Sequence, residues 1–292
     1  MINALTVDVE DYFHVSAFAQ TLSTAQWEQL PSRLEHNTGT LLDLFAERGV
    51  HATFFVLGWV AERFPAVVKA IAAAGHEIAS HGYSHQLVYL QQPQVFADEA
   101  ERSKKLLEDL SGCPVKGYRA ASYSITDRSL WALDTLVELG YEYDSSIFPV
   151  YHDRYGIPGA PAGIHVARAP NGGSIVEFPL TTARLFRWRL PVAGGGYFRL
   201  YPYWLSRLLL GRSVKDADHP FIFYLHPWEV DPGQPRIADA PLLSRFRHYL
   251  NLHRCQGRLE HLIRDFSFGR TSDVIAAYQA RGPLPVYDYG RR

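Results

Sequence analysis

Four times along this chain, a helical segment ends at a glycine and a short apolar segment follows. Glycine commonly follows the last helical residue because it adopts positive φ without strain. The four pairs are residues 41–49 with 52–57, 61–75 with 77–80, 93–112 with 115–118, and 130–140 with 141–144. Strands that alternate with helices build βαβ units and a parallel sheet. The pattern therefore predicts an α/β fold.

The segment 221–225 is apolar on both faces, as strands inside a barrel are. A chain of 292 residues, 47% of them hydrophobic, is large enough for an α/β barrel in one domain. Residues 150–200 are rich in Gly and Pro, and we expect them to form inserted loops and a hairpin near the active face. The tail beyond Pro241 reads as helices at 242–252, 259–266 and 273–279. We therefore divide the chain into a barrel, 1–235, and a helical C-terminal extension, 236–292, packed on the barrel.

Composition narrows the possible partners. The net charge of −1 gives no indication of nucleic acid or an anionic membrane as partner. Arg and His on the polar face of the tail fit a solvated helix face, with a site for an acidic polymer as the alternative. No segment reaches the roughly 18 apolar residues of a membrane span, and the first residues do not resemble a signal peptide. With Cys113 and Cys255 expected to be ordinary thiols, these features fit a cytoplasmic enzyme.

Polar residues gather where predicted strands end. They are Asp8, Glu10, Asp11, His81, Arg119, Asp144 and His226, each at or just past the carboxyl end of an apolar segment. In a βα barrel the carboxyl ends of all strands converge on one face, and that face carries the chemistry. The shared location predicts one site, which no single motif would establish.

His81 and His85 lie four positions apart, so one helical turn would place both imidazoles on the same face. This spacing suits one divalent metal ion, although in a chain with thirteen histidines it could also arise by chance. The acidic cluster 8–11 could add a carboxylate ligand and a second carboxylate that acts as a base. Asp8 and Glu10 share one side of a strand because side chains alternate with a period of two.

The remaining polar residues could complete a hydrolytic site. A bound ion lowers the pKa of its water and polarises a carbonyl oxygen, and Arg119 could keep the base ionised. His226 could act as the acid because its ordinary pKa lies near neutrality. Each has a structural alternative: the aspartates as loop caps, Arg119 in an ion pair, and His226 packed beside Pro227 and Trp228.

With these residues in place, the chain resembles the polysaccharide deacetylase family, carbohydrate esterase family 4, which contains the NodB homology domain. The family's five motifs resemble residues 5–11, 75–85, 117–123, 143–146 and 225–227, in the family's order. The start at 7–13, the stretch 194–199 and the helical tail resemble a subgroup encoded in bacterial exopolysaccharide clusters. The resemblance implies an irregular (β/α)7 TIM-like barrel.

The resemblance also implies roles for individual residues. Asp8 would be the base, Arg119 its partner and His226 the acid, while Tyr123, Asp144 and Trp228 would contact substrate. The metal ligands would be His81, His85 and an acid. Since Val9 stands where the family has a second aspartate, that acid is Glu10 or Asp11, with Glu10 favoured. Ala121 replaces a usual proline in the third motif, near the backbone N–H around Tyr123 that would meet the oxyanion.

We therefore expect removal of N-acetyl groups from amino sugars of a glycan, an exopolysaccharide or a lipid-linked oligosaccharide precursor. The expected cofactor is a divalent metal, zinc first, with cobalt, nickel and manganese as alternatives. Two other hypotheses stay open: an amidohydrolase acting on a small cyclic ureide or imide, and a non-catalytic glycan-binding protein. The protein could also form a homo-oligomer or belong to a polymer-assembly complex.

Overall fold

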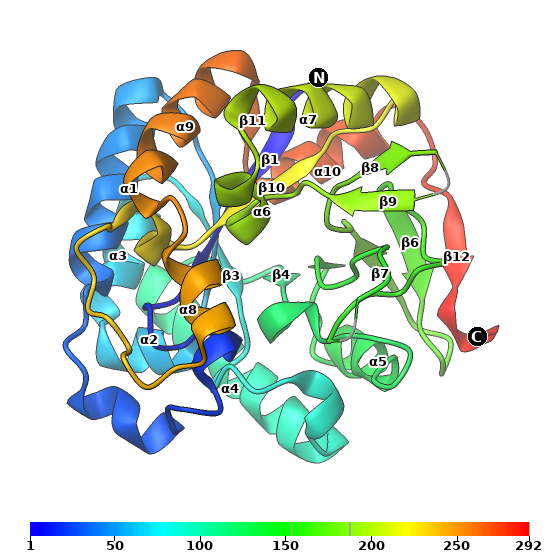
Figure 1. Cartoon of the computed structure of the whole chain (residues 1–292). Helices are drawn as coiled ribbons and strands as arrows, with labels where there is room; N and C mark the ends of the chain where they lie inside the picture. Colours follow the sequence, from blue (N-terminus) through cyan, green and yellow to red (C-terminus); the bar gives the residue numbers. More distant parts are fainter. Residues whose placement is uncertain (153, 187, 292) are drawn as a thin grey trace.

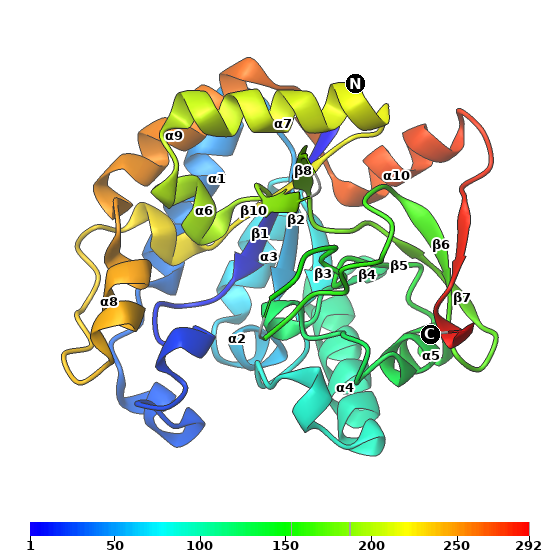
Figure 2. The ribbon, with the colours of Figure 1, turned by 45° about the vertical axis from the view of Figure 1, so that its right-hand side comes forward.

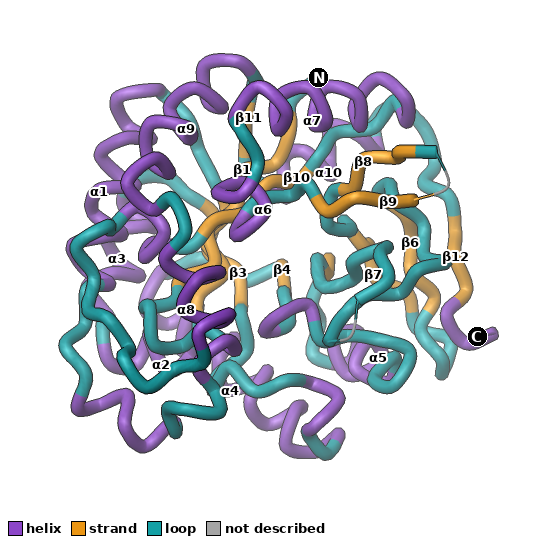
Figure 3. The backbone as a smooth tube through the Cα atoms, in the orientation of Figure 1, coloured by secondary structure: helices purple, strands orange, loops and turns teal. Residues whose placement is uncertain are grey.

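A mostly parallel sheet forms the centre of the protein. The computed structural model describes residues 1–152, 154–186 and 188–291. The strand order is β10-β1-β2-β3-β4-β5-β7-β6-β12, with β11 paired to β1, and β8 and β9 form a separate two-stranded sheet. Within the main sheet only β6 and β7 pair antiparallel among the described strands. Figure 3 shows β1, β3, β4 and β10 near the centre, helices at the top, left and bottom, and β6, β8, β9 and β12 on the right-hand side.

The strands are short, and β1 to β5 and β10 overlap the apolar segments expected from the sequence. Those of the main sheet are β1 (Asn3–Val9), β2 (Thr53–Val56), β3 (Glu77–Ser80), β4 (Gly117–Tyr118), β5 (Tyr143–Asp144), β6 (His165–Arg168), β7 (Ser174–Glu177), β10 (Ile222–Leu225), β11 (Phe268–Gly269) and β12 (Val286–Asp288). The hairpin consists of β8 (Thr182–Leu185) and β9 (Trp188–Pro191). β1 is buried over its whole length because β2 and β10 flank it and helices cover it.

The helices surround the sheet (Figures 1 and 2). They are α1 (Leu34–Arg48), α2 (Gly58–Arg63), α3 (Pro65–Ala73), α4 (Pro93–Ser111), α5 (Trp131–Glu138), α6 (Gly195–Leu200), α7 (Tyr203–Ala217), α8 (Leu242–Tyr249), α9 (Leu252–Asp265) and α10 (Thr271–Gln279). Short 3-10 turns near the site are η1 (Ser16–Phe18), η4 (Ala121–Tyr123) and η5 (Pro227–Val230). No described helix has the length and apolar character that crossing a membrane requires.

The α/β architecture and the glycine stops are confirmed. Gly49 and Gly112 follow α1 and α4 with φ of 62° and 68°. The helix expected at 61–74 is two helices, since Pro65 lacks the N–H that a continuous helix needs and instead begins α3. Among the described strands no pairing joins β10 to β12, so the sheet is open at those ends.

Two regions contribute more to the sheet than expected. In the segment 150–200, the hairpin β8–β9 is present, but β7 pairs with β5 inside the main sheet. The tail is not purely helical, because β11 pairs with β1 and β12 pairs with β6. The C-terminal extension is therefore built into the central sheet at two places. Both cysteines are free thiols, as expected.

Candidate metal centre and active-site cleft

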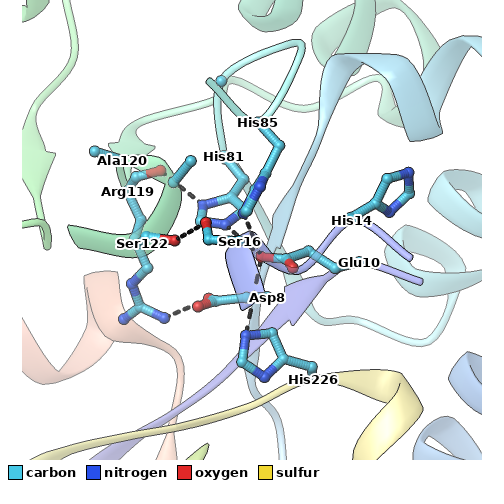
Figure 4. Close-up of polar contacts among 12 residues, drawn as sticks. Asp8, Glu10, His14, Ser16, His81, His85, Arg119, Ala120, Ser122 and His226 are labelled. Atoms are coloured by element: carbon cyan, nitrogen blue, oxygen red, sulfur yellow. Dashed lines mark hydrogen bonds and ion pairs between the residues drawn. The ribbon is translucent and has the colours of Figure 1, made fainter. Parts of the chain in front are cut away.

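Six of the residues expected in the site meet in one cluster (Figure 4). Asp8 lies near the end of β1 and Glu10 directly follows it. His81 follows β3, His85 lies four residues further on, Arg119 follows β4 and His226 follows β10. The parallel registers of β1 with β2 and β10, and of β3 with β4, bring these ends together. The cluster occupies the shared location that the sequence predicts.

Glu10, His81 and His85 are the described group that could hold a metal ion, with their ligand atoms all within 4.8 Å of one another. Glu10 Oε1 lies 3.0 Å from His81 Nε2 and 2.9 Å from His85 Nε2. Burial alone would raise the pKa of Glu10, but His85, His226 and His81 outweigh it and hold that pKa well below its usual value. The carboxylate is therefore ionised and surrounded by imidazoles.

The chemistry of this donor set fits a divalent cation. His81 Nδ1 lies 2.7 Å from the carbonyl oxygen of Arg119, so Nδ1 carries the proton and donates it. In the neutral ring, Nε2 then presents a lone pair to Glu10 Oε1, and two facing acceptors repel unless a cation lies between them. Metal-binding histidines commonly donate the N–H of their other ring nitrogen to a backbone carbonyl in this way. Two imidazoles and one carboxylate are ligands that zinc accepts.

Asp8 forms an ion pair with Arg119. Arg119 is fully buried, and its Nη1 donates to Asp8 Oδ1 at 2.5 Å and to Thr6 Oγ1 at 2.8 Å. Its Nη2 donates to Ser145 Oγ at 3.1 Å. The hydroxyl of Tyr123 lies 3.4 Å from Asp8 Oδ2. One oxygen of Asp8 thus pairs with the guanidinium, and the other lies near the Tyr123 hydroxyl.

His226 belongs to a buried chain of charges that sequence reasoning missed. Its Nδ1 lies 2.7 Å from Glu229 Oε1, and Glu229 Oε2 accepts from Arg199 Nε at 2.6 Å. Burial lowers the pKa of His226, but Glu10, Glu229 and Asp8 outweigh it and raise that pKa to about 9. Burial likewise raises the pKa of Glu229, but Arg199 and His226 lower it to about 2. His226 is therefore held protonated, with Nε2 facing Glu10 at 3.9 Å.

Arg199 is placed by α6 and by the start of that helix. Gly194 has φ 140°, and a Cβ at this position would meet the backbone oxygen of Tyr224 at 1.8 Å. Only glycine fits this close approach. Arg199 Nη1 then donates to the carbonyl oxygens of His248 and Leu250, at 2.6 and 3.0 Å. The spacing of three residues between His226 and Glu229 could have suggested their contact. No pattern in the sequence near either residue predicts that Glu229 pairs with Arg199.

These groups line a cavity of about 510 Å³. Asp8, Glu10, His85, His226 and Trp228 border it, together with side chains of η1, η4, α6 and α8 and with His152, Arg154 and Tyr155. This volume lies within the range of small-molecule and cofactor pockets. Ser16 and Ser122 also line the cavity, and their hydroxyl oxygens lie 2.6 Å apart, within hydrogen-bond distance (Figure 4).

Asp11 lies outside the metal cluster. Its Oδ1 accepts from the N–H of Tyr12, and its Oδ2 accepts from the Ser32 hydroxyl at 2.6 Å and the Arg33 N–H at 2.8 Å. Oδ2 thus binds the loop directly before α1, while Oδ1 caps the turn that follows β1. Of the two acids that the sequence left open, the geometry favours Glu10 as ligand and Asp11 as a loop cap.

The three residues expected to contact substrate differ in position. Tyr123 and Trp228 border the cavity, and the Trp228 ring stacks on His226 with centroids 5.1 Å apart. Asp144 is fully buried and accepts from the Ser146 hydroxyl at 2.6 Å, so it does not form a groove wall. The Tyr123 N–H donates to the Ala120 carbonyl at 3.0 Å and is therefore already engaged, contrary to the oxyanion role expected there.

Comparison with known families divides the chain into two adjacent parts. The polysaccharide deacetylase model matches residues 24–143, and a model described as a domain of unknown function, DUF3473, matches residues 145–276. Residues 24–143 are thus similar to polysaccharide deacetylases. The match includes His81, His85 and Arg119, whereas Asp8 and Glu10 precede it and His226 lies in the second part.

Individual relatives support the same assignment over part of the chain. A peptidoglycan-N-acetylglucosamine deacetylase from Bacillus cereus is 35% identical over 98 residues, which are 33% of this chain and 36% of the relative. Matches to this and two further curated relatives span only 36%, 40% and 32% of their lengths.

Solved structures agree over nearly the whole chain and show the fold. One described as a polysaccharide deacetylase from Mycobacterium smegmatis has a TM-score of 0.65 at 20% identity, covering 97% of this chain and 91% of the other. An allantoinase has a TM-score of 0.59 at 18% identity, covering 96% and 91%. Since a deacetylase and an allantoinase share the fold, the fold alone does not select the substrate.

Proposed function

We propose that this protein is a metal-dependent hydrolase that removes N-acetyl groups from amino sugars. The observation that carries the proposal is the single cleft in which Asp8 and His226 border the Glu10–His81–His85 cluster. A deacetylase needs a base for water and an acid for the departing amine, on either side of the acyl carbon. The cluster supplies both beside a donor set that suits a metal.

The roles of the residues follow from their contacts. Glu10, His81 and His85 would hold the ion, which lowers the pKa of a water and polarises the acetyl carbonyl. Asp8 Oδ2 takes a proton from the attacking water, while Arg119 holds Oδ1 and keeps the carboxylate oriented. His226 donates the proton on Nε2 to the sugar nitrogen, so acetate and a free amine leave. Glu229 fixes the opposite ring nitrogen and Arg199 fixes Glu229.

Three finer points belong to the same proposal. The substrate is an exopolysaccharide or its lipid-linked precursor, the ion is zinc, and the protein acts in the cytoplasm. The name of the Bacillus cereus relative, which specifies N-acetylglucosamine, supports an acetylated amino sugar. Tyr155, Tyr197 and Trp228 border the cavity of about 510 Å³, and aromatic side chains beside the site favour a saccharide.

The test is acetate release from N-acetylglucosamine oligomers by the metal-loaded protein. Asp8→Asn and His81→Ala should each lower kcat/KM by about 100-fold or more, because each removes a group that acts in the transition state. His51→Ala serves as the control, since His51 is exposed and outside the cleft. Failure of the wild type to release acetate from any acetylated glycan, together with turnover of allantoin, would overturn the proposal in favour of a ureide amidohydrolase.

A further inference from the structure

Helix α8 has its polarity reversed relative to an ordinary surface helix. Its buried side chain is His248, whereas Leu242, Leu243 and Phe246 are 80%, 59% and 58% exposed. A helix on a globular core normally buries its apolar stripe and exposes its polar face. Ordering an apolar face toward water is unfavourable, and such faces mark binding surfaces.

This apolar face borders the same cleft as the catalytic groups. Leu243 and Phe246 line the cavity, and Leu200 at the end of α6 lines it as well and is 51% exposed. Figure 1 shows α6 and α8 as neighbouring helices beside the centre of the molecule. We call Leu200, Leu242, Leu243 and Phe246 the apolar edge. It leads from the cavity to the outer surface, because Leu242 is the most exposed of the four.

Arginine side chains line the cavity, and one of them lies on the same helix as part of the apolar edge. Arg247 of α8 and Arg154 line the cavity, and neither has an ion pair among the described residues. The carboxylates that line it are Asp8 and Glu10, which already contact Arg119 and the histidines. The cleft thus offers guanidinium groups to an anion, although the net charge of the whole chain is −1.

From this arrangement we propose that the apolar edge binds the lipid part of the substrate at an anionic lipid surface. The substrate would be an amino sugar joined through phosphate to a hydrocarbon chain, with the acetamide at the metal cluster and the phosphate near the two arginines. The inference rests on the proposed deacetylation. Aliphatic side chains such as Leu200 and Leu243 neither stack on sugars nor donate hydrogen bonds to them, whereas lipid chains match them. Arg on an amphipathic helix with Leu and Phe is typical of segments that lie at a membrane surface.

Binding can be tested without turnover. Wild-type protein should sediment with vesicles of phosphatidylcholine and phosphatidylglycerol, less so at high salt. Leu243→Ser/Phe246→Ser should reduce the bound fraction at least about tenfold, since two apolar side chains no longer leave water. Val286→Ser is the matched control, because Val286 on β12 is also 59% exposed but lies outside the cleft. No binding by the wild type, or equal binding by the double variant, would overturn the proposal.

Turnover measurements test whether the apolar edge contacts lipid or the saccharide part of the substrate. Acetate release is measured on two substrates: prenyl diphosphate N-acetylglucosamine in vesicles, and the soluble tetramer of N-acetylglucosamine. The ratio of the first rate to the second should fall about tenfold in the double variant. An equal loss on both substrates would assign the edge to the saccharide and overturn the proposal. So would a dimer in lipid-free solution that the double variant abolishes. If no substrate is turned over, the proposed function fails while vesicle binding still tests the edge.

The anion source is tested with Arg247→Gln. This variant should bind anionic vesicles more weakly than the wild type and neutral vesicles equally well. Inorganic pyrophosphate should compete only weakly, because it lacks the hydrocarbon chain. Full displacement of the protein from vesicles by pyrophosphate would show a site for free phosphate and would overturn a lipid headgroup as the ligand.

Discussion

The two sides of the cleft hold their polar groups by different means. On the side of β1, β3 and β4, each functional residue lies at a strand end, and the parallel registers set the distances between them. On the side of α6, η5 and α8, a chain of ion pairs links His226 through Glu229 to Arg199, which ends on two backbone carbonyls. The sheet sets the spacing on the first side, which also contains the buried Asp8–Arg119 ion pair, whereas ion pairs between loops and helices set the spacing on the second.

The difference shows where each side is vulnerable. Removing His81 or His85 leaves the registers of the sheet in place, so function should fail locally, whereas removing Asp8 would also leave the buried Arg119 without its ion pair. Removing one member of a buried ion-pair chain leaves another charge without a partner, which costs stability as well as function. The polysaccharide deacetylase match, 24–143, covers much of the first side, whereas the second side lies within residues matched as a domain of unknown function.

The largest effect is expected at the strand-end side, from two adjacent acids. Glu10→Gln should weaken zinc binding by at least about 100-fold, because it removes the charged ligand between two imidazoles. Asp11→Asn should leave the affinity within about threefold and lower the stability by about 1 kcal/mol, because a loop cap is weakened. Calorimetric zinc titration and thermal unfolding measure the two quantities. The reverse pattern would make Asp11 the ligand.

The next effect concerns the ion-pair side and its pH dependence. His226 donates a proton, so activity should fall as pH rises through its pKa. Glu229→Gln removes a negative charge 2.7 Å from Nδ1 and lowers that pKa, so the alkaline limb should move to lower pH by about 1; kcat should be about twofold lower near pH 8 and approach a tenfold loss above about pH 10.

The measurement is kcat against pH for both metal-loaded proteins, so that the ion's charge is common to them. Asp231→Asn is the control, because Asp231 pairs with Arg33 and not with His226. An alkaline limb that stays in place would show that Glu229 only supports the turn.

The smallest effect is expected for a pair of buried carboxyl groups in the central sheet, and it concerns stability. Asp144 and Glu177 are direct partners on β5 and β7. Burial raises the pKa of Asp144 to about 6, and burial with the Asp144 charge raises the pKa of Glu177 well above its usual value. A raised carboxyl pKa makes folding most favourable at low pH and less so as pH rises from about 4 through the folded value.

Glu177→Gln should therefore flatten the pH dependence of the free energy of unfolding between about pH 4 and 7, by on the order of 1–3 kcal/mol. Denaturant titrations at several pH values measure it. The matched control is Glu142→Gln, the same substitution on an exposed side chain directly before β5. If wild type and Glu177→Gln show the same pH dependence, the two carboxyl groups do not share a proton.

Much of the strand-end side could be predicted from sequence. Apolar segments and glycine stops located β1, β3, β4 and β10, and the convergence of parallel strands then brought Asp8, His81, Arg119 and His226 together. Asp144 and Asp11 could not be placed in this way, because a strand-end position does not reveal whether a carboxylate faces the cleft or a neighbouring hydroxyl. Asp144 faces Ser146, and Asp11 faces Ser32.

The sequence by itself determined the local features: where helices stop, which segments are apolar, and which residues end a strand. These depend on backbone conformation and on periodicity over a few residues. Only the tertiary structure decided that Arg199 meets Glu229, that β11 and β12 join the central sheet, and that α8 presents Leu243 and Phe246 to the cleft. Such pairings depend on packing between segments far apart in the chain, and no local pattern encodes that distance.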